Sequence, residues 1–337
     1  MVTMQDVADR AGVSKSTVSR VLSGKVALSR ATCDKVNAAI AELGFRPNTL
    51  AQALANQTSN TVGLVVSNFE GPYFGRLLKT MAQQAELAGK QLMVTDGHDD
   101  PHREREAVQL LVDRCCDAII LYSRFMPANE LAELVTRLPV PLVVMNRPVP
   151  GHPERCVVFD QAAAIQAAVQ HLLQLGHRQM AFISGPQRTL TARTRLQAWR
   201  DALRQAGIEP SPQALVEGDN WVESGYRACR ELLASGGPFT ALLASNDDMA
   251  VGALRALHEA GRRVPEQVSL FGFDDEPLAA YLTPALSTVH IPIESMSECA
   301  MQQALALARG ETVGRLLPFS GSLRLRESTR AWVAADV

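Results

Sequence analysis

The chain has 337 residues, of which 47% are hydrophobic and 20% charged, a composition typical of a globular protein with more than one compact unit. No run of about 18 apolar residues occurs, which excludes a membrane-spanning helix, and the N-terminal MVTMQDVADRAG lacks the apolar stretch of a secretory signal. The net charge of −2 conceals a basic head, because residues 1–58 hold seven Lys/Arg against four Asp/Glu and the remainder holds 26 against 31. This asymmetry is typical of a nucleic-acid module joined to an acidic sensor.

Cysteine and histidine usage predicts neither a disulfide framework nor a metal centre, and no cofactor is expected. The cysteines show no CxxC pair and no Cys/His zinc spacing, which favours buried, reduced thiols in a cytoplasmic protein. His98 and His102, in the segment HDDPH, have no further metal-ligating residues beside them. The six cysteines are Cys33, Cys115, Cys116, Cys156, Cys229 and Cys299.

Two short helices joined by a tight turn are predicted at the N-terminus. Thr3 can cap a helix that begins at the next residue, and Asp6 completes a capping box with it. Gly12 can end this helix in a left-handed turn, and Ser14 can cap a second helix over residues 15–22. A helix-turn-helix needs a small residue, a turn glycine and a buried branched residue, and here these are Ala8, Gly12 and Val18.

A third helix, capped by Ser29 and stopped by Gly44, completes a small core. The three helices alone are also compatible with a plain bundle that binds nothing. The exposed face of the second helix argues against that alternative, because its side chains are donors suited to base edges and phosphates. They are Lys15, Ser16, Ser19 and Arg20.

The segment NTLAQALANQT (48–58) follows Arg46-Pro47 and places Leu50, Ala51 and Leu54 on one helical face. Two helical turns are too short to be stable alone in water. We therefore expect this hinge to fold only with a partner, namely its copy in a dimer together with DNA. An unstructured linker is the alternative when DNA is absent.

The run DVADRAGVSKSTVSRVLSG followed by RPNTLAQALA closely resembles the lactose/galactose repressor family of bacterial regulators, and the resemblance continues to about residue 330. It implies that Lys15, Ser16 and Arg20 read the major groove, with Lys15–Ser16 at the family's variable specificity pair. It also implies phosphate contacts from the hydroxyl residues and minor-groove contacts from the hinge. The expected DNA-binding residues are Thr3, Ser14, Lys15, Ser16, Thr17, Ser19, Arg20, Ser29, Asn48, Ala51 and Leu54.

From residue 61 onward, short apolar runs alternate with amphipathic helical stretches, which predicts parallel strands buried on both faces. Nearly every run ends in a polar residue, and ligands of open α/β sheets bind beyond the carboxyl ends of the strands. The alternative is that each such residue merely caps the next helix. These residues are Asn68, Asp96, Ser123, Asn146, Asp160, Ser184, Asn246 and Asp274.

Three aromatic residues lie near these strand ends, namely Tyr73, Phe74 and Trp221. Flat apolar faces beside hydrogen-bonding groups hold sugar rings or bases, although each aromatic taken alone could belong to the core.

The family resemblance implies a body of two parallel-sheet subdomains, like periplasmic sugar-binding proteins, with the ligand between them. The predicted fold is thus a small all-α helix-turn-helix head plus an α/β body. We expect the head at 1–46, the hinge at 47–59 and the body at 60–337, with an N-subdomain (60–160, 291–320) and a C-subdomain (161–290, 321–337). Arg195, Asn246 and Asp274 are expected to bind ligand hydroxyls. The other cleft residues implied are Tyr73, Phe74, Ser123, Asp160, Thr189, Thr191 and Trp221.

These features predict a transcriptional repressor that binds a palindromic operator as a homodimer in the cytoplasm, at the nucleoid, and is released by a small sugar-like inducer. The phrases ASNDDMAVGALRALHE and VSLFGFDD resemble members that control galactose and β-glucoside operons. Tyr73–Phe74 also resembles purine-responsive members, so a corepressor-dependent regulator with a purine-like ligand is the alternative. Thr189, however, stands where such members have a base-contacting arginine.

Two other classes of protein are alternatives to a repressor. A glycosidase needs two carboxylates that face each other across a bond, whereas Asp247–Asp248 and Asp274–Asp275 are adjacent and point apart. No nucleophile elbow, P-loop or GxGxxG occurs, so we do not expect an enzyme. A transport-type sugar-binding protein would lack the helical head and would carry a signal peptide. No leucine heptads follow the body, which favours a dimer over the tetramers of this family.

Overall fold

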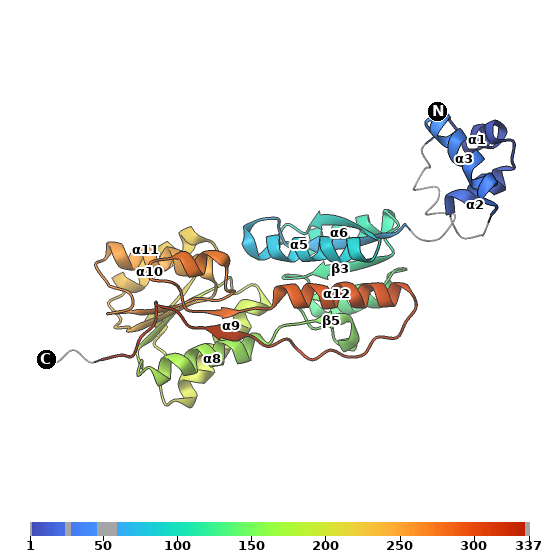
Figure 1. The fold of residues 1–337 in the computed structure, drawn as a ribbon. Helices are drawn as coiled ribbons and strands as arrows, with labels where there is room; N and C mark the ends of the chain where they lie inside the picture. Colours follow the sequence, from blue (N-terminus) through green and yellow to red (C-terminus); the bar gives the residue numbers. More distant parts are fainter. Residues whose placement is uncertain (1, 24–27, 46–58, 334–337) are drawn as a thin grey trace. The chain divides into compact units, whose positions relative to one another are not determined.

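The computed structural model describes residues 2–23, 28–45 and 59–333, and the chain divides into two compact units, Met1–Ser59 and Asn60–Val337 (Figure 1). We call these units the head and the body. The head is helical and the body is an α/β structure with parallel sheets, which confirms the predicted fold class. In the described part of the chain, no helix is long and apolar enough to cross a membrane.

The described head residues form helices whose ends are set by capping residues. The Thr3 hydroxyl accepts a hydrogen bond from Asp6 N at 3.3 Å, and Asp6 Oδ2 accepts one from Thr3 N at 2.7 Å. Gly12 ends the first helix at φ 66°, a left-handed conformation that glycine adopts without strain. Val7, Ala8, Val18 and Val36 are fully buried and hold the helices together. The helices are α1 (Met4–Ala11), α2 (Lys15–Ser23) and α3 (Arg30–Leu43).

The first lobe of the body is a parallel sheet with the strand order β2-β1-β3-β4-β5. Strand β1 is buried along its whole length, which explains why its sequence TVGLVV holds no charged residue and is apolar after Thr61. One face of the sheet packs against α5 and α12, and the other packs against α6 and α7. The strands are β1 (Thr61–Val66), β2 (Gln91–Asp96), β3 (Ala118–Tyr122), β4 (Leu142–Met145) and β5 (Cys156–Val157), and the helices are α5 (Gly71–Leu87), α6 (Pro101–Asp113), α7 (Ala128–Arg137) and α12 (Ile293–Ala308).

The second lobe is a parallel sheet with the order β7-β6-β8-β9, with α8 and α9 on one face and α10 and α11 on the other. Helices α10 and α11 approach so closely that a Cβ added at Gly252 would lie 1.9 Å from the carbonyl oxygen of Val222. The strands are β6 (Met180–Ser184), β7 (Leu215–Glu217), β8 (Ala241–Ala244) and β9 (Ser269–Phe271), and the helices are α8 (Gln161–Gln174), α9 (Leu190–Gln205), α10 (Val222–Ala234) and α11 (Asp247–Glu259).

Three segments of the chain lie side by side at the junction of the lobes. Strands β10 (Thr288–His290) and β11 (Ser322–Arg324) pair in antiparallel fashion, and Asp160 N donates to the carbonyl oxygen of Phe319 at 2.8 Å. A Cβ added at Gly321 would lie 2.9 Å from the side chains of both Phe159 and Val289. The junction therefore depends on a glycine at this crossing.

All six cysteines are free thiols, but the expectation that they are buried is wrong for Cys115. Cys115 follows Arg114, the C-cap of α6, in a left-handed turn at φ 58°, and its side chain is exposed. Cys116, Cys156 and Cys229 are buried, and Cys33 and Cys299 are half-buried.

Candidate functional sites

Helix α2 presents a polar face to solvent and an apolar face to the head's core. Val18 is fully buried, whereas the candidate base-reading side chains on the other face are exposed. The Ser14 hydroxyl lies 2.7 Å from Ser16 Oγ and 2.8 Å from Thr17 Oγ1, so hydroxyl groups cluster at the start of this helix. The exposed residues of this face are Lys15, Ser16, Ser19 and Arg20.

Thr3 and Ser29, which were expected to contact phosphates, are the N-caps of α1 and α3. Both are exposed, and the N-terminus of a helix favours a phosphate through its N–H groups and its dipole. The three hinge residues expected in the minor groove, Asn48, Ala51 and Leu54, lie outside the described residues.

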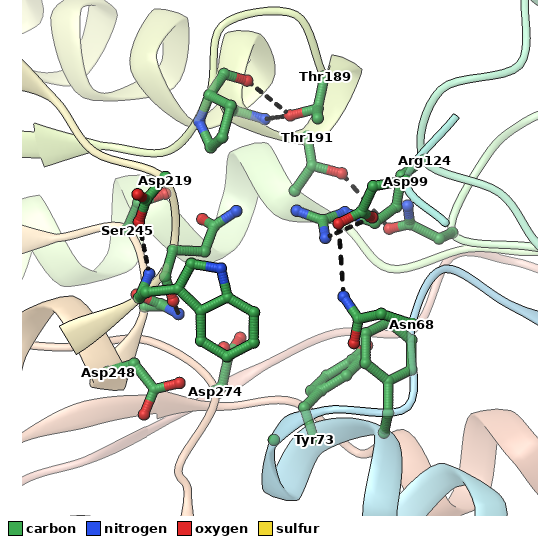
Figure 2. Close-up of a pocket in the computed structure, with 18 of the residues that line it drawn as sticks. Asn68, Tyr73, Asp99, Arg124, Thr189, Thr191, Asp219, Ser245, Asp248 and Asp274 are labelled. Carbon is green, nitrogen blue, oxygen red and sulfur yellow. Dashed lines mark hydrogen bonds and ion pairs between the residues drawn. The ribbon is translucent and has the colours of Figure 1, made fainter. Parts of the chain in front are cut away.

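A cleft of about 1060 Å³, counted to its open mouth, lies between the two lobes of the body (Figure 2). Most of its lining follows the carboxyl ends of the strands of both sheets, where open α/β sheets bind ligands. The structure brings together eight of the residues expected to bind the ligand, namely Tyr73, Phe74, Thr189, Thr191, Arg195, Trp221, Asn246 and Asp274, and with them the strand-end residues Asn68 and Asn146.

Two expected cleft residues, Ser123 and Asp160, are not part of this lining. Ser123 is fully buried, and its hydroxyl donates to Glu104 Oε2 at 2.7 Å. Asp160 caps α8 by accepting from Ala163 N at 2.9 Å. Both strand-end residues satisfy neighbouring groups of the protein, so the helix-capping alternative was correct for Asp160.

Arg195 and Asp274 form a charged pair in the cleft wall. Arg195 Nη2 lies 3.8 Å from Asp274 Oδ1, and Arg195 Nε donates to Gln161 Oε1 at 2.8 Å. Its guanidinium also lies 3.7 Å from the ring centroid of Phe273 and donates to the carbonyl oxygen of Ser245. Burial raises the pKa of Asp274 to about 6, although Arg195 acts against this shift. The cleft thus holds a fixed donor beside a fixed acceptor, which can grip neighbouring ligand hydroxyls.

The backbone at Asp274 is unusual for a residue with a side chain. Its φ is 110°, a region that favours glycine. Asp274 N donates to the carbonyl oxygen of Val289 at 2.9 Å, and its own carbonyl oxygen accepts from Arg76 Nη2 at 3.3 Å. Arg76 belongs to α5 of the first lobe, so the strained segment is held from across the cleft.

Glu276 is a buried carboxyl group in the lining that sequence reasoning missed. Neither of its oxygens has a hydrogen-bond partner among the described residues, and Arg76 Nη2 lies 3.7 Å from Oε1. Burial, reinforced by the neighbouring charge of Asp274, raises the pKa of Glu276 to about 8. A protonated Glu276 can donate to a ligand oxygen, in contrast to Asp274.

Aromatic rings line both sides of the cleft. In the first lobe, Tyr73, Phe74 and Tyr122 pack edge to face, and the Tyr122 hydroxyl donates to the Tyr73 oxygen at 3.1 Å. Burial and Tyr122 together raise the pKa of Tyr73 well above its usual range, so this hydroxyl stays protonated. In the second lobe, Trp221 remains 39% exposed at the start of α10. Its ring is therefore accessible for stacking on a ligand.

Figure 2 shows acidic side chains, among them Asp219, Asp248 and Asp274, on one side of the cleft and Asn68, Asp99 and Arg124 on the other. Sequence reasoning missed much of this lining, because Asp99, Arg124, Phe125 and Arg188 lie in loops without a recognisable motif. Asn68 and Asn146, in contrast, are two of the polar strand ends that the sequence pattern singled out. The lining residues missed are Glu70, Gly71, Pro72, Asp99, Tyr122, Arg124, Phe125, Gln161, Pro186, Arg188, Ala192, Asp219, Asn220, Ser245, Asp248, Glu276 and Ile291.

Comparisons with solved structures relate both units to known regulators. The lac repressor dimer bound to operator and the anti-inducer ONPF matches with a TM-score of 0.89 and 30% identity, covering 98% of this chain and 99% of that one. The complex of the transcriptional regulator CelR with cellobiose matches with a TM-score of 0.73 and 32% identity, covering 97% of this chain and all of that one.

Comparisons of sequence agree. Residues 3–48 match the family model of bacterial regulatory proteins of the lacI family, and residues 169–329 match a periplasmic binding protein-like domain. The HTH-type transcriptional regulator AscG of Escherichia coli is 42% identical over 97% of this chain and 98% of its own length. The regulator GalR of the same organism is 38% identical over 91% and 90%. These relatives confirm the prediction of a DNA-binding transcriptional regulator rather than an enzyme, and the chain belongs to the lacI family of bacterial regulatory proteins.

Proposed function

We propose that the chain represses transcription by binding a palindromic operator as a homodimer, and that a sugar-like inducer in the cleft releases it. The observation that carries this proposal is the buried Arg195–Asp274 pair in a cleft that also presents the accessible ring of Trp221. Charged donors and acceptors beside a flat apolar face suit a sugar ring. The cellobiose in the CelR complex, a protein of the same fold, supports this ligand class.

The head supplies the operator contacts in this proposal. Lys15, Ser16 and Arg20 read base edges in the major groove, and the hydroxyls of Thr3, Ser14, Thr17, Ser19 and Ser29 hold phosphates. The hinge at 47–59 enters the minor groove through Asn48, Ala51 and Leu54. The lac repressor structure, a dimer bound to operator, supports both the partner and the dimer. The protein acts in the cytoplasm, at the nucleoid.

Contacts between the lobes link the cleft to the rest of the body. The Thr191 hydroxyl of the second lobe donates to Asn146 Oδ1 of the first lobe at 3.4 Å, and Arg76 reaches across to the carbonyl oxygen of Asp274. We take the N-subdomain as 60–160 with 291–320 and the C-subdomain as 161–290 with 321–337. An inducer that binds one arrangement of the lobes better than the other shifts their equilibrium by that difference in affinity.

A paired titration tests the proposed function. Sugars and glycosides that raise the melting temperature of the full-length protein are identified first, and each is then titrated into the complex of protein and operator while fluorescence anisotropy is followed. We expect at least one such ligand to release the operator. A set of ligands that all tighten the complex would show corepression instead, and a set that leaves operator binding unchanged would contradict the proposal.

A further inference from the structure

The mouth of the cleft holds two arginines from opposite lobes beside one aromatic ring. The guanidinium carbon of Arg188, from the second lobe, lies 4.6 Å from the ring centroid of Phe125, and that of Arg124, from the first lobe, lies 5.5 Å from the same centroid. All three residues line the cleft. Cation–π contacts at these distances restrain the orientation of a guanidinium. The two cations are therefore held near each other before any ligand arrives.

These two cations differ in how their charge is balanced. Arg124 Nη1 lies 3.2 Å from Asp99 Oδ1. Arg188 has no carboxylate partner among the described residues, and its exposed guanidinium contacts the Phe125 ring. Guanidinium groups are planar donors that bind phosphate or carboxylate oxygens in pairs. Arg188 thus offers its donors to a ligand at the cleft mouth.

Further arginines support the backbone at both positions. Arg193 Nη1 donates to the carbonyl oxygen of Arg188 at 3.2 Å, and Arg147 Nη1 donates to that of Arg124 at 3.1 Å. Two acids lie on the same segments: Glu104 accepts from the Arg124 N–H at 3.0 Å, and Glu217 accepts from the N–H of Gln187 at 3.0 Å. Together with Asp99 these acids leave one positive charge in excess at the mouth. Helix α9, which begins directly after Thr189, adds the positive end of its dipole.

The opposite side of the cleft has the reverse polarity. Asp219, Asp248, Asp274 and Glu276 all line the second-lobe wall near Trp221. The carboxylates of Asp219, Asp248 and Asp274 accept hydrogen bonds from hydroxyls and repel anions, whereas Glu276, whose pKa is raised to about 8, adds a neutral carboxyl group at neutral pH. A ligand that fits the whole cleft therefore has hydroxyls at one end and a negative charge at the other.

We propose that Arg124 and Arg188 form an anion subsite and that the inducer is a phosphorylated sugar or glycoside whose phosphate lies there. This inference rests on the proposed function, because the sugar ring occupies the site between Trp221 and the Arg195–Asp274 pair. A phosphate carries close to two negative charges at neutral pH and three acceptor oxygens, which suits two guanidinium groups. Since the arginines belong to different lobes, a phosphate held by both also favours closure of the cleft.

Matched ligand pairs test the subsite on the full-length protein. Isothermal titration calorimetry at constant ionic strength compares glucose with glucose 6-phosphate and cellobiose with its 6′-phosphate, with glucuronate and inorganic phosphate as further arms. We expect each phosphorylated sugar to bind at least about tenfold more tightly than its neutral parent. If glucuronate bound more tightly than the phosphorylated sugars, the subsite would prefer a carboxylate, which would contradict the proposal of a phosphate.

Variants of Arg188 test whether this residue causes the tighter binding of phosphorylated sugars. Arg188→Gln is expected to remove the preference for the phosphorylated member of each pair, and Arg188→Lys should retain part of this preference. Arg204→Gln is the control, because Arg204 lies on α9 outside the lining and pairs with Glu209.

Two outcomes would overturn the subsite. One is equal affinity for the neutral and the phosphorylated member of each pair. The other is that phosphorylated sugars and inorganic phosphate bind the wild-type protein no more tightly than they bind the Arg188→Gln variant. Release of the operator by neutral sugars would still support the proposed function in either case.

Discussion

The head and the body place their candidate functional groups in opposite environments. On α2 the side chains that face DNA in our proposal are exposed, and they stand on a helix whose other face is buried. In the cleft, Arg195 is 7% exposed and Glu276 is 5% exposed. Burial there shifts the pKa of Asp274 and of Glu276 upward.

This difference has a physical consequence for the two sites. Exposed, hydrated side chains can contact the phosphates of DNA, so the head needs only a rigid helix that presents them. A small ligand must be held by fixed groups away from water, so the body buries charged groups at a cost in stability. Substitutions in the body should therefore have large effects on folding and ligand response, and those in the head should mainly change DNA affinity.

The largest effect is expected from Gly252→Ala in the body. The added methyl would lie 1.9 Å from the carbonyl oxygen of Val222 and 2.5 Å from Tyr226 N, and backbone atoms cannot move aside as a flexible side chain can. We expect the body to lose about 3–5 kcal/mol of unfolding free energy, measured by urea denaturation. Gly75→Ala in α5 is the matched control, because nothing lies within 4 Å of its added Cβ. Equal stability of both variants would contradict the close packing of α10 on α11.

The raised pKa of Glu276 should make the unfolding free energy of the body depend on pH. Its pKa in the folded protein is raised to about 8 from an ordinary value of 4.5, so the folded state binds this proton more tightly than the unfolded state does. The stabilisation is complete below about pH 4.5 and is lost as the pH rises through about 8. We expect unfolding free energy to fall by about 2–4 kcal/mol over this window.

Glu276→Gln should flatten this pH dependence, since the amide stays neutral. Glu133→Gln, at an exposed ion pair with Arg137, serves as the control and should leave the slope intact. If the unfolding free energy of Glu276→Gln fell with pH as steeply as that of the wild-type protein, groups other than Glu276 would cause the pH dependence.

In the head, Arg20→Ala should lower affinity for a selected operator by about 1–3 kcal/mol and affinity for random DNA much less. Arg10→Ala is the control, because Arg10 lies on α1 and pairs with Glu42 at 2.6 Å. Fluorescence anisotropy on both DNAs separates the effects. Equal losses on operator and random DNA would mean that Arg20 contacts only phosphate.

The smallest effect is expected from Thr3→Ala, which removes the acceptor for Asp6 N. Loss of such a cap costs about 1 kcal/mol, so amide exchange in α1 of the full-length protein should accelerate several-fold. Thr3→Ser keeps the hydroxyl and should restore slow exchange. Unchanged exchange in Thr3→Ala would show that the cap adds little to this helix.

The fold was predictable where its signals are local. The caps Thr3 and Ser29 and the stops Gly12 and Gly44 lie next to the helices they bound, and the structure shows each in that role. Strands such as β1 are buried on both faces and are almost entirely apolar, which makes them visible in the sequence. Strand β7 was missed because it has three residues and none of them is buried. Strands β10 and β11 were missed because each has only three residues and they pair with each other over a long separation in sequence.

The cleft was predictable only in part, because its groups come from separate loops of two lobes. Asn246 and Asp274 follow apolar runs and were found on that signal. Ser123 follows such a run too, yet it turns inward to Glu104, and no sequence pattern distinguishes the two outcomes. Arg124, Arg188 and Glu276 were missed because they become neighbours of the ligand site only when the lobes fold against each other.

In the proposed function, Asp274 is the central ligand contact and takes no part in binding DNA. The decisive measurement is the operator affinity of Asp274→Asn with and without an inducer that releases the wild-type protein. We predict nearly unchanged affinity in the absence of inducer and no release in its presence, because the amide lacks the charge that grips ligand hydroxyls. Release at the wild-type inducer concentration, or loss of operator binding in the absence of inducer, would contradict the assignment of the cleft.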